Sequence, residues 1–241
     1  MANLYFDGQH YDCRYQDYDR DIDFWNNLEI CKEASILELC SGTGRLTSIL
    51  SRKANKVTAI DNSISMIEQA KAKLLDHKNI VWINSDIETM NLNDNFDYVI
   101  MGGLSLGGFN NDDFSKVLKN LSRHMKVGGK FIFDGLTANC KVETIKKPRY
   151  RYSYNHPTDG EVNVYYKNEV MDHTEKIQLF YVFNNQLSFD ERNVQYYSME
   201  SLVKQIILNN FQVEFIYSDY DGTSFTSNSK QFVMSIIKGG D

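Results

Sequence analysis

The segment Ile36-Leu-Glu-Leu-Cys-Ser-Gly-Thr-Gly-Arg45 decides the fold of this chain of 241 residues. Its apolar start is typical of a buried strand, and the run LTSILSRK after it has the spacing of a helix. Gly42 and Gly44, in the turn between them, let the backbone pass close to a ligand, while the helix that follows presents free amides. Because a lone G-x-G turn is weak evidence, the rest of the chain must decide what it binds.

Short β-rich runs alternate with amphipathic stretches from about residue 35 to residue 134, the pattern of a parallel sheet covered by helices. The expected strands are SILELC (35–40), KVTAI (56–60), IVWIN (80–84), FDYVIM (96–101) and KFIFD (130–134). We therefore expect a doubly wound, Rossmann-like α/β core.

Two helices of this core have recognisable ends. Ser65 and Glu68 have the spacing of a capping box, and the apolar face of that helix is expected to hold Ile64, Ile67, Ala70 and Leu74. The second helix is expected from about Asp112 to Lys126, with Gly128-Gly129 as its stop signal.

The period changes at Tyr150. The runs YRYSYNH, EVNVYYKNEV, KIQLFYVF and NVQYY are aromatic and β-branched, with polar turns and no helix between them. They predict an antiparallel β insertion after the fifth strand. The interpretation is a single domain over residues 1–241, with a helical cap (1–33), a cofactor-binding core (34–140), an insertion that roofs the acceptor site (150–197), and a final helix with two strands (198–241).

Composition excludes several classes of protein. The 26 basic and 32 acidic residues give a net charge of −6, so no positive field attracts nucleic acid. No apolar stretch is long enough for a signal peptide or a membrane span, and we expect a cytoplasmic protein. The four cysteines form no C-x-x-C pair and no cluster with histidine, so no metal is expected.

Two acids extend the G-x-G signal. Asp61 follows the next strand, 17 residues after Gly44, where a carboxylate can accept hydrogen bonds from both ribose hydroxyls of a nucleoside. Asp86 follows the third strand, where it can accept from an adenine amino group while Ile87 packs on the ring. Taken singly, Asp61 can also be read as a helix N-terminal acid and Asp86 as a turn residue. A dinucleotide site is the nearest rival, but its third glycine is replaced by Thr47.

These segments resemble the class I S-adenosylmethionine-dependent methyltransferases. The matching residues are Glu38 to Gly44, Asp61 with Asn62, Ser85-Asp86-Ile87, and the strand Phe96–Met101 followed by a helix and Gly128 to Asp134. The resemblance covers the chain from about residue 11 to its end. It implies a seven-stranded sheet with an antiparallel last strand and S-adenosyl-L-methionine as the methyl donor. The cofactor-binding residues it implies are Tyr18, Glu38, Cys40, Gly42, Gly44, Asp61, Asn62, Met66, Asp86, Ile87 and Met101.

Several kinds of methyltransferase lack support in this sequence. The loop Gly102–Gly108 replaces the N-P-P-Y motif of base amino-group enzymes. Neither proline precedes a cysteine, as cytosine C5 enzymes commonly require. Metal-assisted catechol-type transfer needs clustered hard ligands, and only Asp134 is evident near that loop.

The run from Tyr11 to Phe24, taken with the β insertion, resembles small-molecule enzymes of the aminosugar and glycine N-methyltransferase type. In those enzymes a pair of N-terminal tyrosines reaches donor and acceptor, and the resemblance assigns Tyr11 and Tyr18 to that pair. The alternative is that both tyrosines only pack a helix on the sheet.

The aminosugar enzymes usually carry a histidine in the loop after the fourth strand, whereas the aligned position here is near Gly107. A basic and aromatic stretch begins at Lys141 and runs through Lys146, Lys147, Arg149 and Arg151 to His156. It can bind a phosphorylated or nucleotide-linked acceptor, or it can be a solvated connector.

The sequence thus predicts methyl transfer to a small-molecule acceptor, by a monomer or homodimer. An amine is favoured because it needs no strong base, with Tyr11, His156 and Tyr152 as the candidate catalytic residues. The alternatives are an O-methyltransferase acting on a sugar or other metabolite, a non-catalytic S-adenosylmethionine-binding regulator, and the dinucleotide enzyme.

Overall fold

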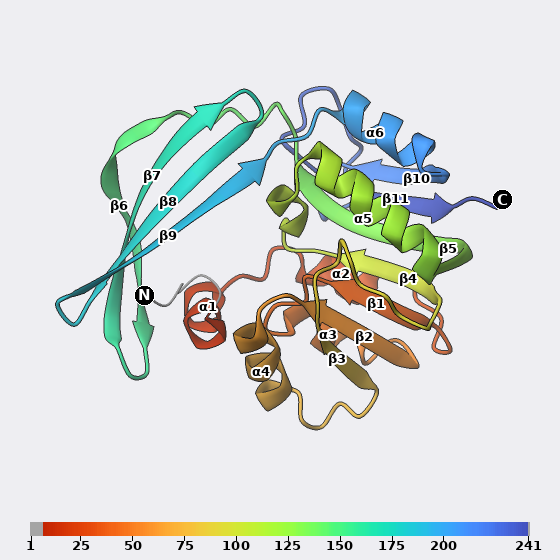
Figure 1. The fold of residues 1–241 in the computed structure, drawn as a ribbon, viewed down its shortest axis with the longest axis horizontal. Helices are drawn as coiled ribbons and strands as arrows, with labels where there is room; N and C mark the ends of the chain where they lie inside the picture. Colours follow the sequence, from red (N-terminus) through yellow and green to blue (C-terminus); the bar gives the residue numbers. More distant parts are fainter. Residues whose placement is uncertain (1–6, 241) are drawn as a thin grey trace.

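The computed structural model describes residues 7–240, which form two β-sheets with their covering helices (Figure 1). The larger sheet has seven strands in the order β10-β11-β5-β4-β1-β2-β3. They are β1 (Ser35–Leu39), β2 (Lys56–Asp61), β3 (Ile80–Asn84), β4 (Phe96–Met101), β5 (Met125–Leu136), β10 (Phe211–Tyr217) and β11 (Gln231–Lys238). Only β11 runs antiparallel to its neighbours, so the expected seven-stranded sheet with an antiparallel last strand is confirmed.

Helices cover both faces of this sheet, as a doubly wound fold requires. The α-helices are α1 (Gly8–Tyr15), α2 (Ile22–Asn27), α3 (Arg45–Leu50), α4 (Ile64–Lys73), α5 (Asn111–His124) and α6 (Met199–Leu208), and a 3-10 helix η1 (Ser105–Gly108) follows β4. Apolar side chains of α5 and α6 pack with one face of the sheet in one core, and those of α2 and α3 pack with the other face in a second core.

The start of α4 differs from the sequence expectation. Its N-cap is Ser63, whose hydroxyl accepts a hydrogen bond from the Met66 amide, so the capping box at Ser65 was wrong. Ser65 lies inside the helix and accepts instead from the amide of Gly8. Ile64 is 55% exposed because it points away from the sheet.

The end of α5 differs as well. The helix stops at His124, and Gly128-Gly129 lies within β5 rather than terminating the helix. The pairing of β5 with β4 is irregular at this point, and a Cβ on Gly129 would meet the carbonyl oxygens of Phe96 and Asp97 at 3.1 and 3.2 Å. Glycine here therefore permits close approach of two strands.

The β insertion is confirmed as a four-stranded antiparallel sheet in the order β6-β7-β8-β9. Its strands are β6 (Ile145–His156), β7 (Gly160–Met171), β8 (Thr174–Phe183) and β9 (Gln186–Gln195). It begins before Tyr150, because Asn168 on β7 accepts a hydrogen bond from the Ile145 amide at 2.7 Å. Figure 1 shows this sheet beside the larger one, with α1 between the insertion and α4.

One face of the insertion has its own apolar core, to which Tyr154, Val164 and Tyr181 contribute. Cys13 of α1 packs against that core, so α1 fastens the insertion to the rest of the fold. Of the expected helical cap at 1–33, residues 1–6 lie outside the described residues. Within residues 7–240, no helix combines the length and the apolar character that a membrane crossing demands.

Candidate functional site

The turn after β1 has the backbone that the G-x-G pattern predicts. Cys40, Gly42 and Gly44 all have positive φ, at 53°, 55° and 83°. A Cβ on Gly44 would lie 3.0 to 3.2 Å from side-chain atoms of α4 and β3, so this glycine is needed for packing. A Cβ on Gly42 would meet no atom within 4 Å. Gly42 therefore offers open space for a ligand, whereas Gly44 closes the turn.

Asp61, at the end of β2, is tied to that turn. Its Oδ2 accepts from the Gly42 amide at 2.8 Å, and its Oδ1 accepts from the Ser63 amide at 2.9 Å. Burial raises the pKa of Asp61, and backbone amides, including that of Asn62, oppose the rise. Each carboxylate oxygen has a second lone pair, so Asp61 can still accept from the ribose hydroxyls of a nucleoside.

Three strand ends converge at Cys40. Burial raises the pKa of its thiol, and the carboxylates of Asp61, Asp86 and Glu38 raise it further. The register agrees, because β2 pairs Asp61 with Asn84 of β3 and the Ser85 amide donates to the Asp61 carbonyl at 3.1 Å. The sequence thus brought together acids that lie 25 or more residues apart from β1 to β3.

Glu38 lies beneath the turn and is 2% exposed. Burial raises its pKa to about 8, and its buried Oε2 has no hydrogen-bond partner among residues 7–240. Since buried polar atoms are seldom left unpaired, this oxygen fits a site that is completed by a ligand.

The remaining predicted cofactor residues lie on the same edge of the sheet. Asp86 is exposed, and its Oδ1 accepts from the Glu88 amide in a turn. Apolar walls are formed by Met66, Ile87 and Met101, which are at most 4% exposed, and Asn62 is exposed beside Asp61. Carboxylates for ribose and adenine beside an open glycine and apolar walls are a donor set that suits S-adenosylmethionine.

Tyr18 contacts a charged pair that the sequence analysis missed. Arg45, next to the glycine turn, donates two hydrogen bonds to the buried Asp21 at 2.6 and 2.8 Å, and Trp25 donates a third to the same carboxylate. The Arg45 guanidinium lies 5.1 Å from the centre of the Tyr18 ring. Only the position of Arg45 after Gly44 could have suggested this contact.

The loop after β4 is held by Asp134, at the end of β5. This fully buried carboxylate accepts from the amides of Gly103 and Leu104 at 3.0 and 2.6 Å, and from the hydroxyl of Tyr220 at 2.8 Å. Burial raises its pKa to about 7, against these hydrogen bonds. Asp134 thus fixes the loop and is no exposed metal ligand.

Tyr11 and Tyr152 lie on the two sides of Arg14. The Arg14 guanidinium is 5.5 Å from the Tyr11 ring and donates to the hydroxyl of Tyr181 on β8 at 2.7 Å. Tyr11 also lies near enough to Arg45 to act on its pKa, which is raised by Asp21 against the effect of burial. Burial raises the pKa of Tyr152, which Arg14 opposes. The structure therefore brings Tyr11 and Tyr18 to the glycine turn, and Tyr152 to Arg14.

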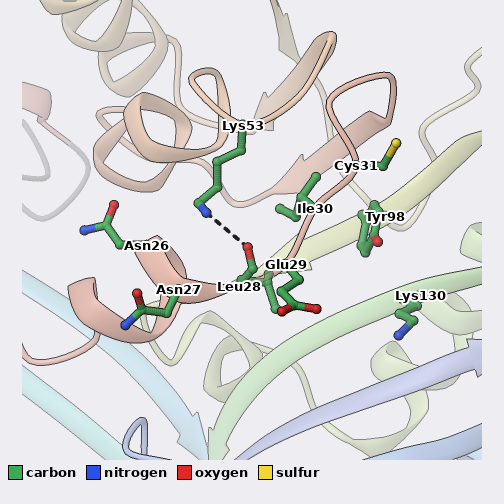
Figure 2. Close-up of a pocket in the computed structure, with 9 residues that line it drawn as sticks. All are labelled: Asn26, Asn27, Leu28, Glu29, Ile30, Cys31, Lys53, Tyr98 and Lys130. Carbon is green, nitrogen blue, oxygen red and sulfur yellow. Dashed lines mark hydrogen bonds between the residues drawn. The ribbon is translucent and has the colours of Figure 1, made fainter.

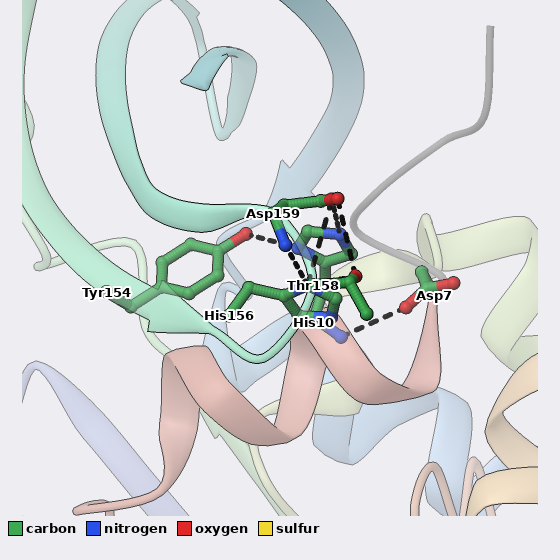
Figure 3. A network of polar contacts seen from close by, with 6 residues as sticks. All are labelled: Asp7, His10, Tyr154, His156, Thr158 and Asp159. Atoms are coloured by element: carbon green, nitrogen blue, oxygen red, sulfur yellow. Dashed lines mark hydrogen bonds and ion pairs between the residues drawn. The ribbon is translucent and has the colours of Figure 1, made fainter. Parts of the chain in front are cut away.

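His156 lies in a separate network (Figure 3). Its ring stacks on that of His10 in α1, while its Nδ1 lies 3.2 Å from the Thr158 hydroxyl. His10 contacts the Tyr154 hydroxyl through Nδ1 and Asp159 through Nε2, at 2.9 and 3.1 Å. The nitrogen and oxygen atoms of His10, His156 and Asp159 lie within 4.8 Å of one another, but these internal bonds already engage them.

An open groove lies toward the amino ends of the strands, away from the glycine turn (Figure 2). Tyr98 and Lys130 pair there across β4 and β5, and Lys53 donates to the Leu28 carbonyl at 3.0 Å. Its other lining residues are Asn26, Asn27, Glu29, Ile30 and Cys31. None of the predicted site residues lines it.

Known proteins share this architecture. Residues 36–129 match the family model described as "Methyltransferase domain". A malonyl-[acyl-carrier protein] O-methyltransferase of Priestia megaterium is 34% identical over 104 residues, which are 42% of this chain and 36% of that relative. The chain therefore spans about a third of that relative's length.

Two solved structures match almost the whole chain. An S-adenosylmethionine-dependent methyltransferase from Clostridium acetobutylicum superposes with a TM-score of 0.77 at 24% identity, over 95% of this chain and 96% of the other. A sugar N-methyltransferase from Streptoalloteichus superposes with a TM-score of 0.72 at 14% identity, over 95% and 91%. Residues 36–129 are therefore a methyltransferase domain, and the chain has the fold of the S-adenosylmethionine-dependent methyltransferases.

Proposed function

We propose that this protein transfers a methyl group from S-adenosyl-L-methionine to an amine nitrogen of a small-molecule acceptor. The observation that carries the proposal is the meeting of Gly42, Asp61 and Asp86 at one edge of the sheet, with the orphaned Glu38 beneath them. The family match over residues 36–129 supports it independently.

Cofactor binding falls to three groups of residues. Asp61 accepts from the ribose hydroxyls, Asp86 and Ile87 hold the adenine, and the open face of Gly42 admits the ligand backbone. The bound cofactor supplies a methyl group on a positively charged sulfur. Net charge −6 and the four acids around the turn favour binding of this cation.

The chain's own contribution to the chemistry is positioning. Holding a lone pair in line with the methyl carbon can lower the barrier by about 7 to 11 kcal/mol in favourable cases. The loop Gly102–Gly108 carries no histidine, and Asp134 behind it is engaged by three hydrogen bonds. An amine needs no base during attack, whereas a hydroxyl does. This absence of a base favours an amine over a hydroxyl.

Among the three candidate catalytic residues, Tyr11 is the best placed to orient the acceptor, because it lies between Arg14 and the Arg45 side of the glycine turn. Tyr152 flanks it from the insertion. His156 is 7% exposed and packs on His10, so its contribution to turnover is small. The sugar and glycopeptide N-methyltransferases among the similar structures support a nitrogen acceptor.

The test is transfer of a labelled methyl group to a panel of small amines and matched alcohols. We expect transfer to at least one amine, at a rate that rises with pH and levels off near the pKa of that amine. Transfer to alcohols with a profile that follows an imidazole would replace this proposal by the O-methyltransferase. Tight cofactor binding without turnover on any acceptor would replace it by the non-catalytic regulator.

A further inference from the structure

The inner face of β9 runs from the loop after β4 to α1. Ser188, Asp190, Arg192 and Val194 alternate along the strand and so point to the same side of the sheet. Asp190 pairs with Leu179 of β8, whose side chain belongs to the buried core of the insertion. At the other end, Val194 lies 3.2 Å from the position of a Cβ on Gly107.

Asp190 is buried on this face without a partner. The residue is 2% exposed, and neither carboxylate oxygen has a hydrogen-bond partner within residues 7–240. In the same part of the chain, no Lys, Arg or His nitrogen lies within 4.0 Å of these oxygens. A buried carboxylate with two empty oxygens is costly, and folded proteins seldom retain one without a use.

The surroundings of Asp190 are rich in arginine and tyrosine. The Asp190 charge acts on the Tyr181 hydroxyl, which accepts a hydrogen bond from Arg14. Arg14 and Arg192 both act on Tyr152. Two guanidinium groups thus accompany one carboxylate, so positive charge is already present locally. What the carboxylate lacks is hydrogen-bond donors.

We propose that Asp190 anchors an acceptor subsite for a polyhydroxylated, sugar-like group, and that its two oxygens accept from donors on adjacent ring carbons. The inference rests on the proposed function and names the class of its acceptor. A cationic group is disfavoured there by Arg14 and Arg192, whereas neutral hydroxyls are not. The tyrosines supply aromatic surface for the apolar face of a sugar ring, and the guanidiniums can donate to its oxygens.

The subsite lies some way from the reacting atoms. Four residues of extended strand separate Asp190 from Val194, which is about 13 Å at the usual rise per residue. Asp190 therefore holds a part of the acceptor remote from the reacting nitrogen, and it is a positioning residue rather than a catalytic one.

The experiment measures binding of hexoses and hexosamines by saturation-transfer NMR, with the chain saturated in S-adenosylhomocysteine. It compares the wild-type protein with Asp190→Asn and with Asp172→Asn, a control for loss of charge at an exposed turn. We expect at least one sugar to bind the wild type and the control at least tenfold more tightly than Asp190→Asn. A monodeoxy analogue that lacks one of the two donors should bind the wild type weakly and lose little more in the variant.

A second measurement needs no ligand. Removing an unpaired buried charge should raise the melting temperature of Asp190→Asn above that of the wild type. A lower melting temperature would mean that the carboxylate has an internal partner, and would overturn the proposal. So would a panel in which no sugar distinguishes the wild type from Asp190→Asn. Cofactor affinity separates the two claims, because a wild type that fails to bind S-adenosylmethionine contradicts the proposed function instead.

Discussion

The imidazole rings of His10 and His156 stack face to face, with centroids 3.8 Å apart and planes inclined by 3° (Figure 3). His10 belongs to α1 and His156 to the end of β6, so the stack joins the helix beside the glycine turn to the insertion. Asp159 and Tyr154 complete the junction through the two nitrogens of His10. Two imidazolium rings in this arrangement would repel each other, and the junction is therefore sensitive to acid.

The first prediction concerns that sensitivity. Burial lowers the pKa of His10 below 6.5, His156 lowers it further, and Asp7 and Asp159 oppose the shift. Because the unfolded chain then binds protons more readily than the folded one, this stabilising contribution is complete above pH 6.5 and is lost as pH falls below it. We expect the melting temperature to fall more steeply below pH 6.5 in the wild type than in His10→Phe.

The comparison with His10→Phe is necessary because Glu38 and Asp134 have raised pKa values and contribute the opposite slope. Both proteins contain these acids, so the difference between the two curves isolates His10. Parallel curves would exclude His10 as the group responsible.

The second prediction concerns Asp61. Asp61→Ala removes the acceptor of two ribose hydrogen bonds, each worth about 1.5 to 3 kcal/mol. Affinity for S-adenosylmethionine should therefore fall by about a hundredfold or more, as measured by calorimetry, while circular dichroism stays unchanged. Asp76→Asn, at an exposed position, is the matched control. Equal affinities of variant and control would show that the carboxylate does not contact the cofactor.

Much of the fold was readable because apolar periodicity is a local signal. The five core strands, the insertion and the glycine turn each lie in one short window of sequence, and Asp61 follows its strand directly. Helix ends were less certain, because Ser63 and Ser65 are equally good caps in sequence and only packing separates them. Gly128-Gly129 has the composition of a helix stop, yet it permits the contact of β5 with β4.

The parts of the site that the sequence could not predict depend on long-range contacts. Arg14 meets Tyr181 across 167 residues, and His10 meets Tyr154 across 144. No local pattern pairs such residues, and nothing in the run SFDERN marks Asp190 as buried. His156 was chosen for its chemistry, but its contacts link it to α1, which only the folded chain could reveal.

The third prediction concerns the loop after β4. Tyr220→Phe removes the hydroxyl that donates to Asp134. The pKa of Asp134 is raised to about 7, so the carboxylate is ionised above that pH, where it accepts a charge-assisted bond. Urea unfolding should show a loss of about 1.5 to 3 kcal/mol at pH 8 and a smaller loss at pH 6. The same loss at both values would mean that Asp134 does not titrate in this range.

The fourth prediction concerns turnover. Tyr11→Phe removes one orienting hydrogen bond and should lower kcat by about tenfold to a hundredfold. His156→Ala should lower it less, because that ring packs on His10. Steady-state rates on the best amine of the panel provide the measurement. Abolition of activity by His156→Ala, with Tyr11→Phe fully active, would reverse the assignment of the two residues.

The most direct test of the central claim is calorimetric titration of the wild-type chain with S-adenosylmethionine and, separately, with NAD. The edge formed by Gly42, Asp61 and Asp86 predicts micromolar binding of S-adenosylmethionine, about 7 to 9 kcal/mol, and no measurable heat with NAD. Binding of NAD with no heat from S-adenosylmethionine would contradict the account.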